Sequence, residues 1–281
     1  MSASTWSPLP RRRRDGSRVR CRRGRALRAG TLTGAAVAAT VGGLLATVTP
    51  VAARIRRLRM QAADVPVLDH TLHLPGSPPT RTVAVLGDSA AAGHGLSDAE
   101  LALPARVGRE LWARDGRETR VRCAAVAGAD TAGVLERQLT AARDAEVVVV
   151  MAGVNDALSP RRRLRSAERT YDRLLTAVTA NHAAPSRVVA VMCPDLSVAP
   201  SLPRILRPVV GVRCRSMARR QLRLAARHGV GVVALPASVL PRAVLGDDGL
   251  HPGVEGHRRL AGAIVAAVVE PRPAAATAPA G

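Results

Sequence analysis

The sequence predicts a three-layer α/β/α sandwich built on a five-stranded parallel sheet. Between residues 82 and 269, short β-branched runs alternate five times with amphipathic stretches. The run Val147–Val150 is continuously apolar, as a parallel strand covered on both faces requires. Because crossovers between parallel strands are right-handed, the alternation places helices on both sides of the sheet. Ligands bind at the carboxyl ends of the strands in such a sheet, so a catalytic residue should directly follow a strand.

The expected elements come in pairs, each a strand followed by a helix. The strands are the β-branched runs, and the helices are the stretches whose apolar residues recur with helical spacing. In chain order the pairs are Thr82–Leu86 with Leu101–Arg114, Arg120–Val126 with Thr131–Arg143, Glu146–Met151 with Ser166–Asn181, Arg187–Cys193 with Val212–His228, and Gly231–Leu235 with Val254–Val269. We therefore expect one α/β domain over residues 82–270, preceded by a Pro-rich linker over 54–81 and followed by a disordered tail of Ala and Pro over 271–281.

Composition excludes several classes of function. The 281 residues include no Phe, only three aromatic residues, and no Lys, so all 42 basic residues are Arg. Without Lys, neither Schiff-base chemistry nor a phosphate-binding loop of the GxxxxGK type is available. Three aromatic residues cannot form a platform on which bases stack. The net charge of +21 is concentrated in the first 59 residues, so we expect no nucleic-acid partner.

The N-terminal segment has the composition of an export signal or a membrane anchor. Residues 1–28 form an Arg-rich leader, and residues 29–53 form an uncharged run long enough to cross a bilayer, although Ala, Thr and Gly make it weakly hydrophobic. The small residues at 51–53 suit cleavage by a signal peptidase. More Arg precede the run than follow it, which places the domain outside. We expect an exported protein, secreted or anchored through residues 29–53 on the outer face of the cytoplasmic membrane. A basic, disordered tail on a cytosolic enzyme is the alternative.

A serine and a distant Asp-His pair carry the chemistry. Ser89 follows the first expected strand directly, and Gly87 permits a tight turn there. A serine becomes a nucleophile when a histidine takes its proton and an acid orients that histidine. Asp248 stands three residues before His251, a spacing that allows the carboxylate to hold Nδ1 while Nε2 faces the serine. Taken alone, Gly-Asp-Ser also fits a helix-capping turn.

Two further strand ends supply hydrogen-bond donors. Gly128 follows the second expected strand, and Asn155 follows the third. Acyl transfer needs donors aimed at the oxyanion of the tetrahedral intermediate. The backbone N–H groups of Ser89 and Gly128 and the side-chain amide of Asn155 are the candidates, although Asn155 alone also fits a turn.

The ordered set Gly-Asp-Ser, Gly128, Gly-x-Asn-Asp and Asp-x-x-His-Pro resembles the SGNH (GDSL) hydrolase family between residues 82 and about 269. With its Arg-rich leader, the chain is similar to exported or membrane-anchored actinobacterial GDSL-type esterases. The resemblance implies a flavodoxin-like SGNH hydrolase fold, a triad of Ser89, His251 and Asp248, and an oxyanion hole of Ser89, Gly128 and Asn155. Residues 90–92 are all Ala, where the family usually has Leu and hydroxyl residues, and no Asn precedes Gly128. The chain has no Gly-x-Ser-x-Gly elbow, which argues against an α/β-hydrolase.

The expected function is that of a serine esterase, a monomeric domain that needs no cofactor and hydrolyses carboxylic esters, acyl or acetyl, of a small-molecule or lipid-like substrate. The apolar connection 196–210 is expected at the catalytic edge, where it could line an acyl pocket or pack over the sheet edge. Three alternatives remain: an acyltransferase that uses the same triad on a sugar or lipid acceptor, an inactive membrane-tethered binding domain, and a binder of anionic membranes or nucleic acid.

The other histidines and the cysteines suggest no metal site. His94 follows the nucleophile turn and could contact substrate, whereas His257 is expected to face solvent. No His or Cys cluster has the spacing of zinc ligands. Cys193 and Cys214 are the pair best placed for a disulfide, although buried free thiols are the commoner state.

Overall fold

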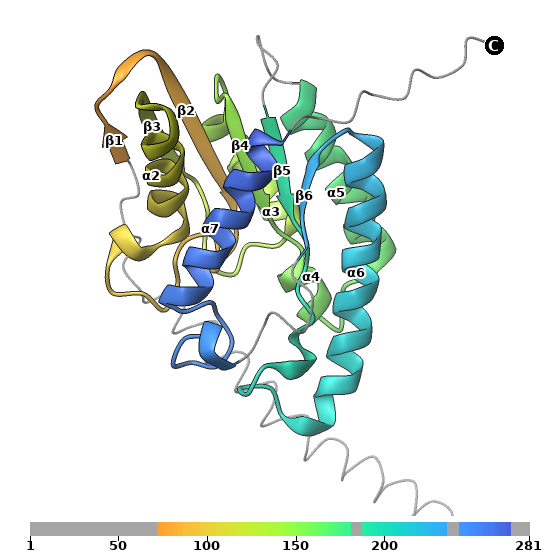
Figure 1. The fold of residues 1–281 in the computed structure, drawn as a ribbon. Coiled ribbons are helices and arrows are strands. Elements are labelled where there is room, and N and C mark those ends of the chain that lie inside the picture. The colour runs from red at the N-terminus through yellow and green to blue at the C-terminus, as the bar shows by residue number, and fades with distance from the viewer. Residues whose placement is uncertain (1–71, 181–186, 235–241, 271–281) are drawn as a thin grey trace, which may run out of the picture. The chain divides into compact units, whose positions relative to one another are not determined.

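The computed structural model describes residues 72–180, 187–234 and 242–270, which form a three-layer α/β/α sandwich (Figure 1). The strand order in the sheet is β1-β3-β2-β4-β5-β6. The strands are β1 Leu72–Leu74, β2 Ser77–Gly87, β3 Arg117–Cys123, β4 Val147–Met151, β5 Arg187–Val191 and β6 Gly231–Val233. The helices are α2 Leu103–Asp115, α3 Thr131–Arg137, α4 Val154–Leu158, α5 Leu164–Ala180, α6 Arg207–Arg227 and α7 Val254–Val269. Short 3₁₀ turns are η1 Ala99–Leu101, η2 Leu139–Ala142, η3 Leu196–Val198, η4 Arg204–Leu206 and η6 Arg242–Val244.

The sheet contains the five expected parallel strands and one more. Strands β2 to β6 pair in parallel, whereas β1 pairs antiparallel with the β3 edge, with Leu72 opposite Val121. Residues 72–81, expected as the end of a linker, thus form β1 and the first part of β2. The reason is that the pairing of β2 with β3 is irregular between Ser77 and Arg81, and its pairing with β4 begins only at Val83, so Pro78 and Pro79 interrupt no regular ladder.

Strand β4 explains why the core has two halves. All five of its residues are buried. Successive side chains of a strand point to opposite faces, so Val147 and Val149 pack with residues of α2 and α7, while Val148 and Val150 pack with residues of α5 and α6. Burying each such side chain is worth about 1.5–3 kcal/mol. The continuous apolar run is therefore required by helices on both faces, as predicted.

Helix α3 ends at Arg137, earlier than the predicted Arg143, and a 3₁₀ turn follows it, whereas Pro or Gly marks two other helix boundaries. Helix α6 begins at Arg207, five residues earlier than predicted, and Pro208 lies in its first turn, where its missing N–H costs nothing. Helix α2 ends at Gly116, whose φ of 66° is the left-handed conformation that terminates helices. One of the Pro residues in the 196–210 connection, Pro208, thus marks the start of a helix.

Two predictions about side chains have different outcomes. Cys193 and Cys214 are both buried and free, as is the usual state of such thiols. The prediction that His257 faces solvent is wrong, because its side chain is fully buried. On α7, His257 precedes Leu260 and Ile264 by three and seven residues, so all three share the face that packs on the sheet.

In the part of the chain that the structure describes, no helix is both long enough and apolar enough to span a bilayer. The leader 1–28, the uncharged run 29–53 and the tail 271–281 lie outside the described residues.

Candidate active site

Ser89 lies in a turn that begins where β2 ends. Gly87 closes the strand at a point where a side chain has no room, because a Cβ there would lie 2.3 Å from the carbonyl oxygen of Met151. The turn is closed by the N–H of His94, which donates to the carbonyl of Ser89 at 2.9 Å. The side chain of Ser89 is thereby presented at the carboxyl edge of the sheet.

A buried glutamine, Gln138, holds the end of β2 just before Ser89. The Gln138 amide accepts a hydrogen bond from the Gly87 N–H at 2.7 Å and donates one to the Gly87 carbonyl at 2.9 Å. Gln138 is 2% exposed, so both bonds lie away from water. Sequence analysis missed this residue, although its spacing of four from buried Val134 places it on the same face.

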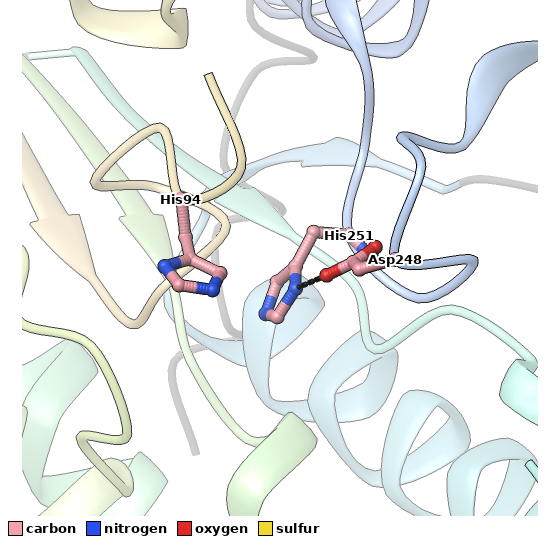
Figure 2. Close-up of side chains that lie close together, drawn as sticks. All are labelled: His94, Asp248 and His251. Atoms are coloured by element: carbon pink, nitrogen blue, oxygen red, sulfur yellow. Dashed lines mark hydrogen bonds and ion pairs between the residues drawn. The ribbon is translucent and has the colours of Figure 1, made fainter. Parts of the chain in front are cut away.

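Ser89, His251 and Asp248 are joined by hydrogen bonds. The Oγ of Ser89 lies 2.9 Å from Nε2 of His251, and the Nδ1 side of that ring is bonded to one carboxylate oxygen of Asp248 (Figure 2). The other oxygen of Asp248 accepts from the N–H groups of Leu250 at 2.9 Å and His251 at 3.0 Å. The carboxylate therefore holds both the ring and the loop that carries it.

The His251 loop is closed on itself and pinned to its neighbours. The N–H of Gly246 donates to the carbonyl of His251 at 2.9 Å, and Leu245 and Pro252 form an isolated antiparallel bridge. Ser201, in the connection that follows β5, donates from both its N–H and its hydroxyl to the Gly249 carbonyl. The 196–206 segment thus packs directly beside the Asp-His pair.

Two carboxylates near Ser89 titrate in opposite directions. Burial raises the pKa of Asp88 to about 6, since its side chain is almost completely removed from water. Burial would also raise the pKa of Asp248, but the hydrogen bonds from the His251 ring and from the backbone outweigh it and lower this pKa to about 2. Asp248 is therefore ionised at neutral pH and can stabilise a positively charged His251.

The predicted oxyanion donors lie on loops tied to the end of β2. The N–H of Val126 donates to the Gly87 carbonyl at 3.1 Å, which brings the loop carrying Gly128 beside the nucleophile turn. Within the described ranges, the N–H groups of Ser89 and Gly128 donate to no acceptor. Asn155 lies in the first turn of α4 and donates one amide hydrogen to the Ala129 carbonyl at 2.8 Å. Its second amide hydrogen remains available to substrate.

Asp156, which sequence analysis left without a role, positions these loops. Its Oδ2 accepts from the backbone N–H of Thr131 at 2.9 Å and from the Thr131 hydroxyl at 2.7 Å, and its side chain is buried. Arg162 lies 3.6 Å from its other oxygen. The residue after Asn155 thus joins α4 to the start of α3, on either side of the predicted oxyanion hole.

The ring of His94 lies against the ring of His251. The centroids of the two rings are 4.5 Å apart and their planes are inclined by 69°. Burial and the neighbouring His251 lower the pKa of His94. Nitrogen atoms of the two rings and a carboxylate oxygen of Asp248 all lie within 4.8 Å of one another, a cluster of potential metal ligands (Figure 2). This cluster could not be recognised from the sequence, because His94 lies near the beginning of the domain sequence and His251 near its end.

Comparison with known proteins gives a family match and a curated relative. Residues 85–259 match the model of the GDSL-like lipase/acylhydrolase family. A GDSL-like esterase of Mycobacterium tuberculosis is 27% identical over 184 residues, 62% of this chain and 57% of that protein, so the match spans little more than half the length of this curated relative.

Solved structures share the fold. A lipase/acylhydrolase from Enterococcus faecalis is 25% identical with a TM-score of 0.54, over 66% of this chain and 94% of that one. The protein TesA is 22% identical with a TM-score of 0.54, over 67% of this chain and 98% of that one. With the family model covering more than half of its length, the chain belongs to the GDSL-like lipase/acylhydrolase family.

Proposed function

We propose that the protein is a serine esterase that hydrolyses carboxylic esters, acyl or acetyl. The observation that carries the proposal is the hydrogen-bonded chain from Ser89 Oγ through His251 to Asp248 at the carboxyl edge of the sheet. A serine needs such a base to act as a nucleophile, and the base needs an acid to orient it. Family membership and the esterase among the relatives support the same chemistry.

The geometry suggests the following steps. Nε2 of His251 takes the Ser89 proton as Oγ attacks the ester carbonyl, and the negative oxygen of the tetrahedral intermediate accepts hydrogen bonds from Ser89, Gly128 and Asn155. His251 then gives its proton to the leaving alcohol. Water attacks the acyl group on Ser89 and loses a proton to His251. His251 returns this proton to Ser89 Oγ as the bond between Oγ and the acyl carbon breaks, which releases the carboxylic acid.

An apolar acyl group is the substrate feature that the surroundings favour. Leu196 and Leu202 are buried in the segment that rests on the Asp-His loop, while Ile205 in the same segment is 67% exposed. An exposed, branched apolar side chain beside a catalytic loop can contact an acyl chain without a large rearrangement. This supports an acyl-ester or lipid-like substrate.

Export stays part of the proposal. Residues 29–53 would serve as signal peptide or anchor and place the domain outside the cytoplasmic membrane. Fractionation of cells that express the full chain, with N-terminal sequencing of the product, tests this. Intact chain in the cytosol would contradict it, whereas a product beginning after Ala53 or intact chain in the membrane would support it.

Labelling with a fluorophosphonate probe tests the nucleophile. Wild-type protein should be labelled and Ser89→Ala should not, while Ser166→Ala, on the exposed surface of α5, serves as the matched control and should be labelled normally. Nitrophenyl esters of increasing chain length then report the preferred acyl group. Labelling that persists in Ser89→Ala would overturn the assignment.

Product analysis separates hydrolysis from acyl transfer. The proposal predicts free carboxylic acid as the main product even when sugar and glycerol acceptors are present. Acylated acceptor as the main product would instead assign the same triad to a transferase.

A further inference from the structure

His94 lies beside His251, the proposed catalytic base, at a position from which both rings could bind the same metal ion. Figure 2 shows its ring facing the edge of His251 that is not bonded to Asp248. The ring centroids are 4.5 Å apart, and both residues are partly exposed to solvent. Neither the triad nor the predicted oxyanion hole uses His94, so the pair of imidazoles is a feature that ester hydrolysis does not explain.

The Asp248–His251 pair already has the form of a metal-binding histidine. Metal-bound histidines usually donate their second ring N–H to a carboxylate, which fixes the tautomer and makes the ligating nitrogen more basic. In this structure Nδ1 of His251 is bonded to Asp248, which leaves Nε2 as the ligating atom. Imidazole nitrogens suit Zn²⁺, Cu²⁺ and Ni²⁺, whereas Mg²⁺ and Ca²⁺ prefer oxygen ligands.

We propose that His94 and His251 together bind a first-row transition metal ion such as Zn²⁺, and that the bound ion closes the active site reversibly. Asp248 acts as the outer partner of His251. Ser89 Oγ, 2.9 Å from Nε2, or water completes the coordination. Metal binding itself is independent of the esterase activity, but its inhibitory consequence rests on the proposed function.

The required rearrangement is small. With Zn–N bonds of about 2.0–2.1 Å, tetrahedral ligand atoms lie about 3.3 Å apart. The two ring centroids are 4.5 Å apart, and a nitrogen of one ring lies within 4.8 Å of a nitrogen of the other, so a movement of about 1.5 Å brings one nitrogen of each ring to this separation. His94 stands between Gly93 and Gly95, both with positive φ, in a turn at the surface. Rotation of its ring about the side-chain bonds can supply this movement, because the residue is only partly buried.

The chemical consequence follows from a single lone pair. The Nε2 lone pair that takes the Ser89 proton is the same pair that forms the bond to the metal. While the ion is bound, the Ser89 hydroxyl has no base, and attack on an ester carbonyl stops. The ion exchanges hydration waters for the two imidazoles, and removal of the ion by a chelator restores the base.

Direct titration tests binding without reference to activity. The full chain, free of affinity tags and treated with a chelator, is titrated with Zn²⁺ in a calorimeter. We expect one site in wild type, at least about tenfold weaker binding in His94→Gln, and unchanged binding in His228→Gln. His228 is the matched control because it also pairs with a carboxylate, Asp172, but belongs to the far end of α6. Co²⁺ spectra identify the donors, since the buried thiols would produce a thiolate charge-transfer band and imidazoles would not.

Turnover of a nitrophenyl ester, measured in the same titration, tests whether the bound ion inhibits hydrolysis. Zn²⁺ should inhibit wild type and His228→Gln at the concentration at which it binds, and at least about tenfold higher concentrations should be needed for His94→Gln. Chelator should restore activity, and Mg²⁺ should not inhibit. Equal binding to wild type and His94→Gln, or a thiolate band, would overturn the proposal. Loss of binding in His94→Gln without hydrolysis of any ester by wild type would uphold the metal site and overturn the esterase.

Discussion

Two segments each place one aspartate carboxylate near Ser89, and the two carboxylates have opposite pKa shifts. The turn after β2 carries Asp88, which is 2% exposed and accepts one hydrogen bond from another residue, from the Ala90 N–H at 3.1 Å. The loop before α7 carries Asp248, whose two oxygens accept three hydrogen bonds. The pKa of Asp88 is raised to about 6, and that of Asp248 is lowered to about 2.

The contrast shows that burial alone does not decide the charge of an aspartate. Both carboxyl groups lose water, but only Asp248 regains the lost solvation from protein donors. It is ionised over the whole neutral range and can balance a positive charge on His251. Asp88 titrates near pH 6, so it adds negative charge to the site only above that pH. Environments that separate two pKa values in this way assign different roles to chemically identical groups.

The largest effect should come from replacing His251, the residue whose ring is bonded to Asp248. His251→Ala leaves Ser89 without a base, so turnover of a nitrophenyl ester should fall on the order of 10³-fold or more. Steady-state kinetics measure this, and circular dichroism checks that the domain still folds. Near-normal turnover in a folded His251→Ala variant would remove the basis of the comparison.

Replacing the ionised carboxylate should have the next largest effect. Asp248→Asn removes the charge opposite the His251 ring and lets the ring adopt the wrong tautomer, so kcat should fall about 10²-fold, less than at His251. Asp247→Asn, one residue earlier, is the matched control and should retain activity. Equal losses in both variants would indicate damage to the loop rather than a role for the Asp248 charge.

The buried carboxyl should give folding stability an unusual dependence on pH. The folded chain holds the Asp88 proton more tightly than the unfolded chain, so this contribution is fully present below pH 3.8 and is lost as pH rises through about 6. The loss is at most about 3 kcal/mol, from a shift of about two pKa units. Asp248 acts in the other direction, because its contribution is lost as pH falls through about 2.

Urea unfolding of wild type and Asp88→Asn at pH 4.5 and pH 7 measures this contribution. Wild type should lose stability relative to Asp88→Asn between these two pH values, since the variant has no carboxyl to ionise. A free-energy difference between the two proteins that is the same at both pH values would show that Asp88 does not titrate there.

The smallest effect should be on the rate. Above pH 6, ionised Asp88 favours the positive His251 formed during attack, a charge that Asp88→Asn lacks. The ratio of kcat/KM between wild type and Asp88→Asn should therefore rise a few-fold from pH 5 to pH 8, which a pH series measures. A flat ratio would limit Asp88 to a structural role.

Sequence patterns predicted the parts of the molecule that are local. Five parallel strands, the order of the motif blocks and the Asp-His spacing are all properties of short segments, and Ser89, Asp248 and His251 are joined as predicted. The placement of Gly128 and Asn155 around an oxyanion stays a prediction.

Features that depend on packing between distant segments were not predicted. Gln221 on α6 is one: its amide accepts from the Cys193 N–H and donates to the Ala152 carbonyl, each at 2.7 Å, and so joins the ends of β4 and β5. The contrast between the pKa values of Asp88 and Asp248 is another, since the number of hydrogen bonds that each carboxylate accepts depends on how its turn or loop folds. Strand β1 was missed because it has only three residues and is followed directly by Pro75 and Gly76, which are typical of a linker.

The 162 residues that separate Ser89 from His251 also set a timetable for biosynthesis. A ribosome that adds about 5–20 residues per second makes Ser89 roughly 10–30 seconds before His251. Throughout that interval the nascent chain contains a serine with no partner to activate it. Any product truncated before residue 251 therefore lacks the histidine that we propose as the base.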